Sequence, residues 1–457
     1  MTENMTEGKP SVLIVRFAVP LLLGNLLQQM YNMIDASIVG RVLGANALAG
    51  VGASSSVQFL VLGFCMGISA GFGIPVAKYF GAGHYERLKT CIFHAYLLTG
   101  FFAVVITLST ALLCHRILEI MSTPENIYDN AYIYLLIIFL GIPFTLFYNL
   151  LASIMRAVGD SRTPFMFLAF STVLNIILDI LLIAVIKLGC AGAGLATVIA
   201  QAVSGIACFV RIQRKHPLLK LDRNSCRFNI YALRELFIMG VPMGLQYSIT
   251  AIGSMVMQSA NNSLGSVCVS GFTAGSKLKQ LAMCPFDAFA TGVSVFCSQN
   301  LGAGKTERIK KGIFSGIAIG VGYGAFIGAV LIFTGRTLSM MFVKASETEV
   351  LDASGKYLFC LGFFYWLIGI LNVTRMTVQG LGYSAVALFS GVIEMISRIA
   401  VSRIFVPKYK FTAICFTDQC AWITATIYCS IVCTLCVRAV IKKSKEGRLN
   451  NSDIHKV

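Results

Sequence analysis

The stretch FGAGHYER at residues 80–87 occurs a second time as LGAGKTER at residues 301–308, 221 positions further along the chain. A Val-Pro pair at residues 19–20 likewise recurs at residues 241–242. Similarity at a fixed spacing is the sequence signature of an internal repeat. The chain is therefore predicted to contain two halves of the same architecture.

The composition is that of a membrane protein. Of the 457 residues, 56% are hydrophobic and only 12% are charged, about half of the ~25% that is typical of soluble domains. The mean hydropathy is +0.77. So few charges cannot cover the surface of soluble domains, which excludes a soluble enzyme, a disordered chain and a secreted disulfide-rich protein. The net charge of +17 resides in short gaps between apolar runs, so we expect no nucleic-acid partner.

The apolar runs predict twelve transmembrane helices, six in each half. A spanning helix needs ~20 mostly apolar residues, and continuous runs favour helices over a barrel of alternating strands. The fold class is therefore an all-α membrane protein made of two six-helix bundles. The predicted spans are 12–39, 46–79, 90–114, 130–155, 164–187, 190–212, 233–260, 267–298, 311–334, 354–379, 384–406 and 411–440.

Basic residues predict the orientation of these spans. With the N-terminus inside, 24 Lys and Arg residues fall on the inner side and 8 on the outer side, so both termini are expected in the cytoplasm. Six spans bring the second half in from the same side, which makes the repeat parallel, with a pseudo-two-fold axis along the membrane normal. The predicted domains are an N-terminal lobe at 1–215, a cytoplasmic linker at 216–232, and a C-terminal lobe at 233–457 that ends in a basic tail.

Acidic residues at membrane depth are costly and usually face a cavity. Asp35 and Asp179 have no acidic counterpart in the second half, where Val256 or Met257 and Ser402 stand instead. A group present in one half only is not required by the shared fold. Asn175 lies four residues before Asp179 and shares its helix face. We predict that Asp35, Asn175 and Asp179 together bind a proton or a small cation such as Na+.

Further residues support this site. Asn149 and Thr197 on flanking helices offer additional oxygens, although the whole group also fits a structural hydrogen-bond cluster. Pro20 precedes Asp35 by fifteen residues in the same span, and a proline inside a helix frees a carbonyl and forms a hinge. Because Pro242 repeats it, this kink also fits an architectural role.

Ionisable residues of the second half are secondary candidates. Glu394 and Arg398 are four residues apart and are interpreted as an intrahelical pair that offsets the burial of both charges. Lys277 and Asp287 share one predicted helix, where they either line a cavity of the second half or have a structural role.

Several motifs together resemble the multidrug and toxic-compound extrusion (MATE) transporters, and most closely their prokaryotic DNA-damage-inducible branch. They are Val19-Pro20, the segment QQMYNMID at 28–35, the Gly-Ala-Gly turns, and the loop with Arg156, Gly159-Asp160 and Pro164. The resemblance implies a V-shaped pair of six-helix lobes that exports drugs in exchange for H+ or Na+.

The resemblance also implies roles for particular residues. Members of this branch use a first-helix aspartate, a preceding proline hinge and an Asn-x-x-x-Asp pair on the fifth helix, which match Asp35, Pro20, Asn175 and Asp179. Other branches carry acids on the seventh and tenth helices. Here those spans, 242–260 and 356–380, contain none, so no cation site of that type is expected in the second lobe.

The sequence thus predicts a secondary active efflux transporter in the prokaryotic plasma (inner) membrane. It would export drugs or amphipathic, cationic organic compounds by antiport with H+ or Na+, with alternating access between two lobes. We expect no cofactor besides the coupling ion, and small organic substrates and the lipid bilayer as partners of a functional monomer.

Two other functions were weighed. A flippase for lipid-linked saccharides is expected to have several intramembrane arginines, of which few occur here. A membrane-embedded enzyme needs a nucleophile–base or metal set, and no His-x-x-x-His or Glu-x-x-His motif is present. The protein is therefore predicted not to be an enzyme.

Overall fold

The computed structural model describes residues 4–121, 123–222 and 225–446, and over these residues it contains helices but no strand. Ten described helices are long and apolar enough to cross a membrane, and two bent helix pairs raise the number of spans to twelve. The prediction of an all-α membrane protein with twelve spans is confirmed. The end of the predicted basic tail, residues 447–457, lies outside the described residues.

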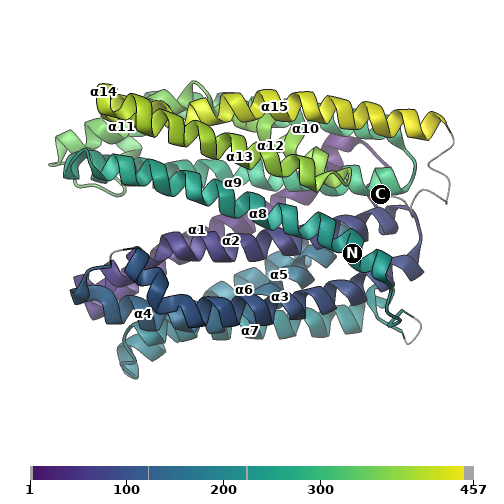
Figure 1. Cartoon of the computed structure of the whole chain (residues 1–457), viewed down its shortest axis with the longest axis horizontal. Coiled ribbons are helices and arrows are strands. Elements are labelled where there is room, and N and C mark those ends of the chain that lie inside the picture. The colour runs from purple at the N-terminus through teal and green to yellow at the C-terminus, as the bar shows by residue number, and fades with distance from the viewer. Residues whose placement is uncertain (1–3, 122, 223–224, 447–457) are drawn as a thin grey trace. The chain divides into compact units, whose positions relative to one another are not determined.

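The chain divides into two compact units (Figure 1). Unit 1 contains Leu23–Gly244, and unit 2 contains Met5–Leu22 and the chain from Leu245 onward. The division therefore passes through two helices, α1 (Pro10–Leu43) and α8 (Ile230–Asn262), two residues beyond Pro20 and Pro242. The predicted lobe boundaries at 215 and 233 stay predictions.

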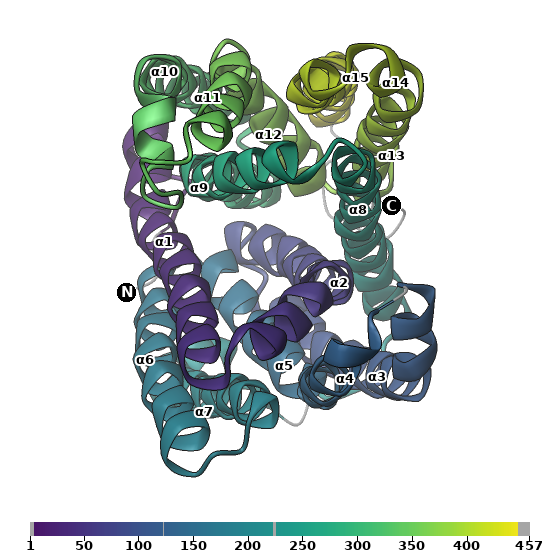
Figure 2. The ribbon, with the colours of Figure 1, turned by 90° about the vertical axis from the view of Figure 1, so that its left-hand side faces the viewer.

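Unit 1 is built around α5, which packs against α2, α3 and α7 (Figure 2). Its helices are explained by the local sequence, since they form in long apolar runs that contain good helix formers and end at glycine or polar turns. Besides the parts of α1 and α8, they are α2 (Ala45–Gly81), α3 (Tyr85–Ile120), α4 (Glu125–Leu140), α5 (Ile142–Ala157), α6 (Arg162–Asp179), η1 (Ile180–Val185), α7 (Cys190–Lys215) and η2 (Pro217–Leu219).

Unit 2 repeats this arrangement, with α12 packed against α9, α10 and α15. Its elements are α9 (Ser266–Gly302), α10 (Thr306–Ser339), α11 (Thr348–Gly362), α12 (Tyr365–Gly380), α13 (Ser384–Ala400), η3 (Val401–Phe405), α14 (Val406–Tyr409) and α15 (Phe411–Lys445). Matching helices start at matching positions: α10 and α15 begin 221 residues after α3 and α7, and α12 begins 223 residues after α5. These offsets relate the side chains of the two units.

Two of the predicted spans are each built from two helices joined at a bend. The span at 130–155 consists of α4 and α5, bent by 47°, and the span at 354–379 consists of α11 and α12, bent by 55°. Pro143, in the first turn of α5, cannot continue the hydrogen-bond ladder of α4. The second break, at Phe363-Phe364, has no proline. Hydropathy reports the length of an apolar run, not its continuity as a helix.

The repeated Gly-Ala-Gly stretch ends a helix in both units. Gly83 and Gly304 have φ angles of 71° and 68°, a left-handed conformation that glycine adopts without steric cost. The second glycine of each repeat is therefore required by the backbone conformation of the turns that follow α2 and α9.

Candidate functional site: a carboxyl pair in unit 1

Asp35 and Asp179 meet inside unit 1. Asp35 lies on α1 and is 7% exposed, while Asp179 is fully buried as the last residue of α6. The two carboxyl groups are within hydrogen-bonding reach of each other. One oxygen of each, Oδ1, has no hydrogen-bond partner in the described structure. The sequence prediction that these two acids share a site agrees with this geometry.

The helix changes character directly after Asp179. The α-helical ladder of α6 gives way to the π-helical turn η1, which widens the helix. Such turns occur frequently at functional sites. Unit 2 has a π-helical turn, η3, at the corresponding place after α13, so the turn belongs to the shared fold and only the carboxyl group is particular to unit 1.

Neutral polar groups surround the pair. In the orientation that gives both ends of its amide a partner, Asn175 donates from Nδ2 to Asp179 Oδ2 at 3.0 Å and accepts from the Thr197 backbone N–H at 3.1 Å. The Tyr31 hydroxyl lies 3.5 Å from Thr197 Oγ1. Asn175 and Thr197 are therefore brought to the carboxyl pair, as their prediction requires.

Asn149 is placed differently. Its Nδ2 donates to the Thr145 carbonyl oxygen at 2.8 Å, one turn earlier in α5. The structure thus gives Asn149 a partner within its own helix, and its predicted part in ion binding has no contact to support it.

Sequence reasoning missed three neutral residues near the carboxyl pair. Tyr31 precedes Asp35 by one helical turn, a spacing that places both on one face of α1 and was a usable signal. Tyr134 hydrogen-bonds to Gln58 near Asp35. These two residues come from α4 and α2, and nothing in their local sequence connects them to α1.

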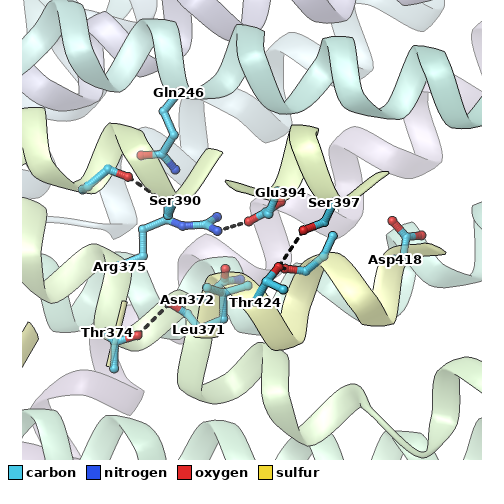
Figure 3. A network of polar contacts seen from close by, with 12 residues as sticks. Gln246, Leu371, Asn372, Thr374, Arg375, Ser390, Glu394, Ser397, Asp418 and Thr424 are labelled. Atoms are coloured by element: carbon cyan, nitrogen blue, oxygen red, sulfur yellow. Dashed lines mark hydrogen bonds and ion pairs between the residues drawn. The ribbon is translucent and has the colours of Figure 1, made fainter. Parts of the chain in front are cut away.

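The corresponding region of unit 2 holds a buried ionic network, of which Figure 3 shows the Arg375–Glu394 pair and the position of Asp418. Arg375 pairs with Glu394, and Arg398 contacts both Glu394 at 3.3 Å and Asp418 at 3.1 Å. Lys279 Nζ lies 2.7 Å from Asp418 Oδ2. The predicted intrahelical pair of Glu394 and Arg398 is present, but it is one part of a larger network.

The other secondary candidates lie on α9. Asp287 accepts a hydrogen bond from Asn372 Nδ2 at 3.3 Å, and Lys277 Nζ lies 5.4 Å from the centre of the Phe342 ring. Both side chains are exposed. Pro20, the predicted hinge, is buried within α1.

No lysine, arginine or histidine in the described part of the chain forms an ion pair with Asp35 or Asp179. A pair of buried carboxyl groups without a fixed counter-charge holds its charge balance through a mobile ion or a proton. The site can therefore bind and release a small cation, which the network of unit 2 cannot do without breaking its own ion pairs.

The family model MatE matches residues 20–181 and 242–404, one match for each repeat. The chain belongs to the MatE family of MATE transporters. It is 30% identical to the probable multidrug resistance protein YpnP of Bacillus subtilis over 90% of this chain and 89% of the relative. It is also 30% identical to the probable multidrug resistance protein YoeA of the same organism, over 82% and 83%.

Solved structures show the same fold. A structure described as MATE in complex with MaL6 superposes with a TM-score of 0.89 at 19% identity, covering 97% of this chain and all of the other. As a MATE protein, this chain is a multi-pass membrane transporter and not an enzyme. The family assignment covers both halves, whereas the carboxyl pair is found in unit 1 alone.

Proposed function

We propose that this MATE protein exports amphipathic organic cations by antiport with protons, with Asp35 and Asp179 as the proton-binding pair. The observation that carries the proposal is the direct approach of the two buried carboxyl groups, with no basic side chain of the described residues paired to either one. Two carboxylates within hydrogen-bonding reach of each other repel strongly unless a proton or a cation lies between them. The names of the relatives YpnP and YoeA support multidrug compounds as cargo.

A proton fits the surroundings of the pair better than Na+. A sodium ion at Asp35, Asn175 and Asp179 would use the Asn175 amide oxygen as a ligand. In the orientation that gives both ends of the amide a partner, that oxygen accepts from the Thr197 N–H and the amide nitrogen faces Asp179 instead. A donor pointing at the carboxyl group is compatible with a shared proton and unsuited to a bound cation. Sodium coupling is the alternative outcome of the experiment below.

The proton site is connected to the hinge by one helix. Asp35 lies fifteen residues beyond Pro20 in α1, which is ~22 Å along a helix axis. Pro20 leaves one carbonyl of the preceding turn without its helical hydrogen bond, so bending costs least there. Protonation neutralises Asp35 and Asp179 and so changes which conformation of α1, bent or straight at Pro20, is favoured. Alternating access follows from this conformational change. Positive-inside topology supports a plasma-membrane transporter with both termini in the cytoplasm.

The test uses purified protein in proteoliposomes that are loaded with a fluorescent organic cation such as ethidium. Transport is started by a pH gradient in sodium-free buffer or by a Na+ gradient at equal pH. We expect transport only with the pH gradient, and loss of that transport in Asp35→Asn and Asp179→Asn.

Asp129→Asn is the matched control, because Asp129 is an exposed acid of α4 and loses the same charge. Unchanged pH-driven transport in Asp35→Asn at equal protein content would refute the role of the pair. Transport driven by the Na+ gradient alone would identify sodium, and not the proton, as the coupling ion at the same site.

A further inference from the structure

Unit 2 contains a groove at a place that aromatic side chains occupy in unit 1. The groove has a volume of about 830 Å³ and runs between α10 and α15, with α12 at its base. Its body is lined by apolar side chains, among them Ile313, Phe314, Ile317 and Ile370. The carboxyl pair and the ionic network do not contribute to this lining.

One end of the groove is basic. Lys310 lies in the second turn of α10, and Arg438, Lys442 and Lys445 lie in the last turns of α15. Among the described residues of the lining, Glu446 is the one acid, 3.9 Å from Lys442. Since α10 starts where α15 ends, all four basic residues gather at the same end, and the remainder of the lining is uncharged apart from Glu446, with Thr374, Ser430 and Thr434 among the apolar side chains.

The matching place in unit 1 is filled. Tyr96, Phe147 and Phe209 pack there, with ring centres 6.4 Å apart for Tyr96 and Phe147 and 5.9 Å apart for Phe147 and Phe209. The helix offsets of 221 and 223 residues place Ile317, Ile370 and Ser430 of unit 2 at these positions. Three rings are thus replaced by two smaller aliphatic side chains and a serine, which opens the groove.

The charge at the matching end is also different. Lys89, the counterpart of Lys310, pairs with Asp222 at 2.7 Å in the loop after α7, whereas Lys310 pairs with Glu307 of its own helix at 3.0 Å. Unit 2 continues α15 through Arg438, Lys442 and Lys445 in that place. The shared fold therefore requires neither the groove nor its basic end, and both occur together in one unit.

The dimensions correspond to one leaflet. The groove lining on α15 extends from Ser430 to Lys445, which is ~22 Å of helix, close to half of the ~40–45 Å thickness of a bilayer with its headgroups. A ligand that fits has an anionic group at the membrane surface and a hydrocarbon chain that reaches toward the bilayer centre.

We propose that this groove binds an anionic phospholipid. Arg438, Lys442, Lys445 and Lys310 hold the phosphate, and an acyl chain lies along Ile313, Phe314 and Ile317. Basic side chains at the membrane surface attract anionic lipids. A soluble phosphate would use the basic end alone and leave the apolar body without an occupant.

The experiment measures lipid binding to the detergent-solubilised full-length protein by native mass spectrometry. The probes are phosphatidylglycerol, phosphatidylcholine with the same acyl chains, and soluble glycerol 3-phosphate. We expect one phosphatidylglycerol to bind at least about tenfold more tightly than phosphatidylcholine, without competition from glycerol 3-phosphate. Equal binding of the two lipids, or displacement by glycerol 3-phosphate, overturns the proposal.

Two variants locate the lipid. Lys442→Gln is expected to reduce the preference for phosphatidylglycerol, whereas Lys443→Gln, which removes the same charge from the next residue outside the lining, keeps it. Ser430→Phe with Ile317→Tyr restores rings of unit 1 and is expected to abolish binding without changing any charge. If that variant does not fold, Ile370→Phe alone tests the same point. Equal loss in Lys442→Gln and Lys443→Gln, or full binding after the groove is filled, contradicts the site.

Discussion

At corresponding positions, one unit has charged side chains where the other has neutral ones. Where unit 1 has Gln58, Asn175 and Thr197, unit 2 has Lys279, Arg398 and Asp418, and the fixed charges of unit 2 pair with one another. Where unit 1 has the carboxyl groups of Asp35 and Asp179, unit 2 has Met257 and Ser402. Among the described residues, unit 1 gives these two acids no basic partner, whereas unit 2 pairs its buried acids with arginine and lysine side chains.

This difference shows how a duplicated fold separates two roles. In unit 2 both buried acids, Glu394 and Asp418, have a guanidinium or ammonium group beside them. Binding of an ion from solution to either acid would therefore leave a buried basic side chain without its partner. In unit 1 the described residues supply no counter-charge to Asp35 and Asp179, which in our proposal comes from solution. We therefore expect equivalent substitutions in the two units to have opposite consequences for stability and transport.

The largest expected effect on stability is that of Asp418→Asn. This change leaves Arg398 and Lys279 without one of their carboxylates and is expected to lower the free energy of unfolding by ~3–5 kcal/mol. SDS-induced unfolding of the solubilised protein measures it. Asp352→Asn is the control, since Asp352 forms an exposed pair with Arg336 and is expected to change stability by less than ~1 kcal/mol. Similar losses of unfolding free energy in both variants would contradict a structural role of the network.

The next effect concerns close helix packing in unit 2. A Cβ on Gly328 of α10 would lie 2.3 Å from the Gly362 carbonyl oxygen, whereas a Cβ on Gly322 of the same helix meets nothing within 4 Å. Gly328→Ala is expected to destabilise the protein by ~1–3 kcal/mol, and Gly322→Ala is expected to be neutral or slightly stabilising. The same unfolding assay compares them, and equal stability of the two variants would show that α10 and the bend before α12 adapt freely.

A smaller effect on stability is expected for Asp179→Asn, which makes in unit 1 the same Asp-to-Asn change as the first test. Replacing one member of a like-charged pair by a neutral amide removes repulsion, so the free energy of unfolding should change by less than ~1 kcal/mol and should not fall. Proton-driven transport in the same preparation should be lost. A loss of stability as large as that of Asp418→Asn would mean that the carboxyl pair of unit 1 is structural as well.

The smallest expected effect is the pH dependence at His216, directly after α7. Burial lowers the pKa of His216 below its ordinary value, and the Asp160 carboxylate, 3.7 Å away, opposes this only in part. The unfolded chain therefore takes up a proton at a higher pH than the folded chain, so stability is complete above ~6.5 and falls as the pH drops below it.

Val437 occupies the corresponding position in unit 2, so the effect should be confined to unit 1. His216→Gln is expected to flatten the dependence of the unfolding midpoint on pH between 7 and 5, as measured by thermal denaturation. An unchanged slope in that variant would assign the dependence to other groups.

The predicted site residues that the structure brings together were found from local spacing or from comparison of the repeats. Asn175 and Asp179 share a helix face because they are four residues apart, and the lack of an acid at the matching positions separated Asp35 and Asp179 from architectural residues. Asn149 shows the limit of this reasoning, because its position on a flanking helix did not reveal that its amide bonds to Thr145. Gln58 and Tyr134 carried no signal, because they approach Asp35 from distant parts of the chain.

By itself, the sequence determined the membrane environment, the twelve apolar spans, the duplication and the restriction of the carboxyl pair to one half. Each of these depends on composition, on run length or on spacing along the chain. Only the tertiary structure decided that the fourth and tenth spans bend, that Asp418 balances Arg398 and Lys279, and that a groove with a basic end opens beside α15. These depend on contacts between residues far apart in sequence, whose distances are set by helix packing and not by the local chain.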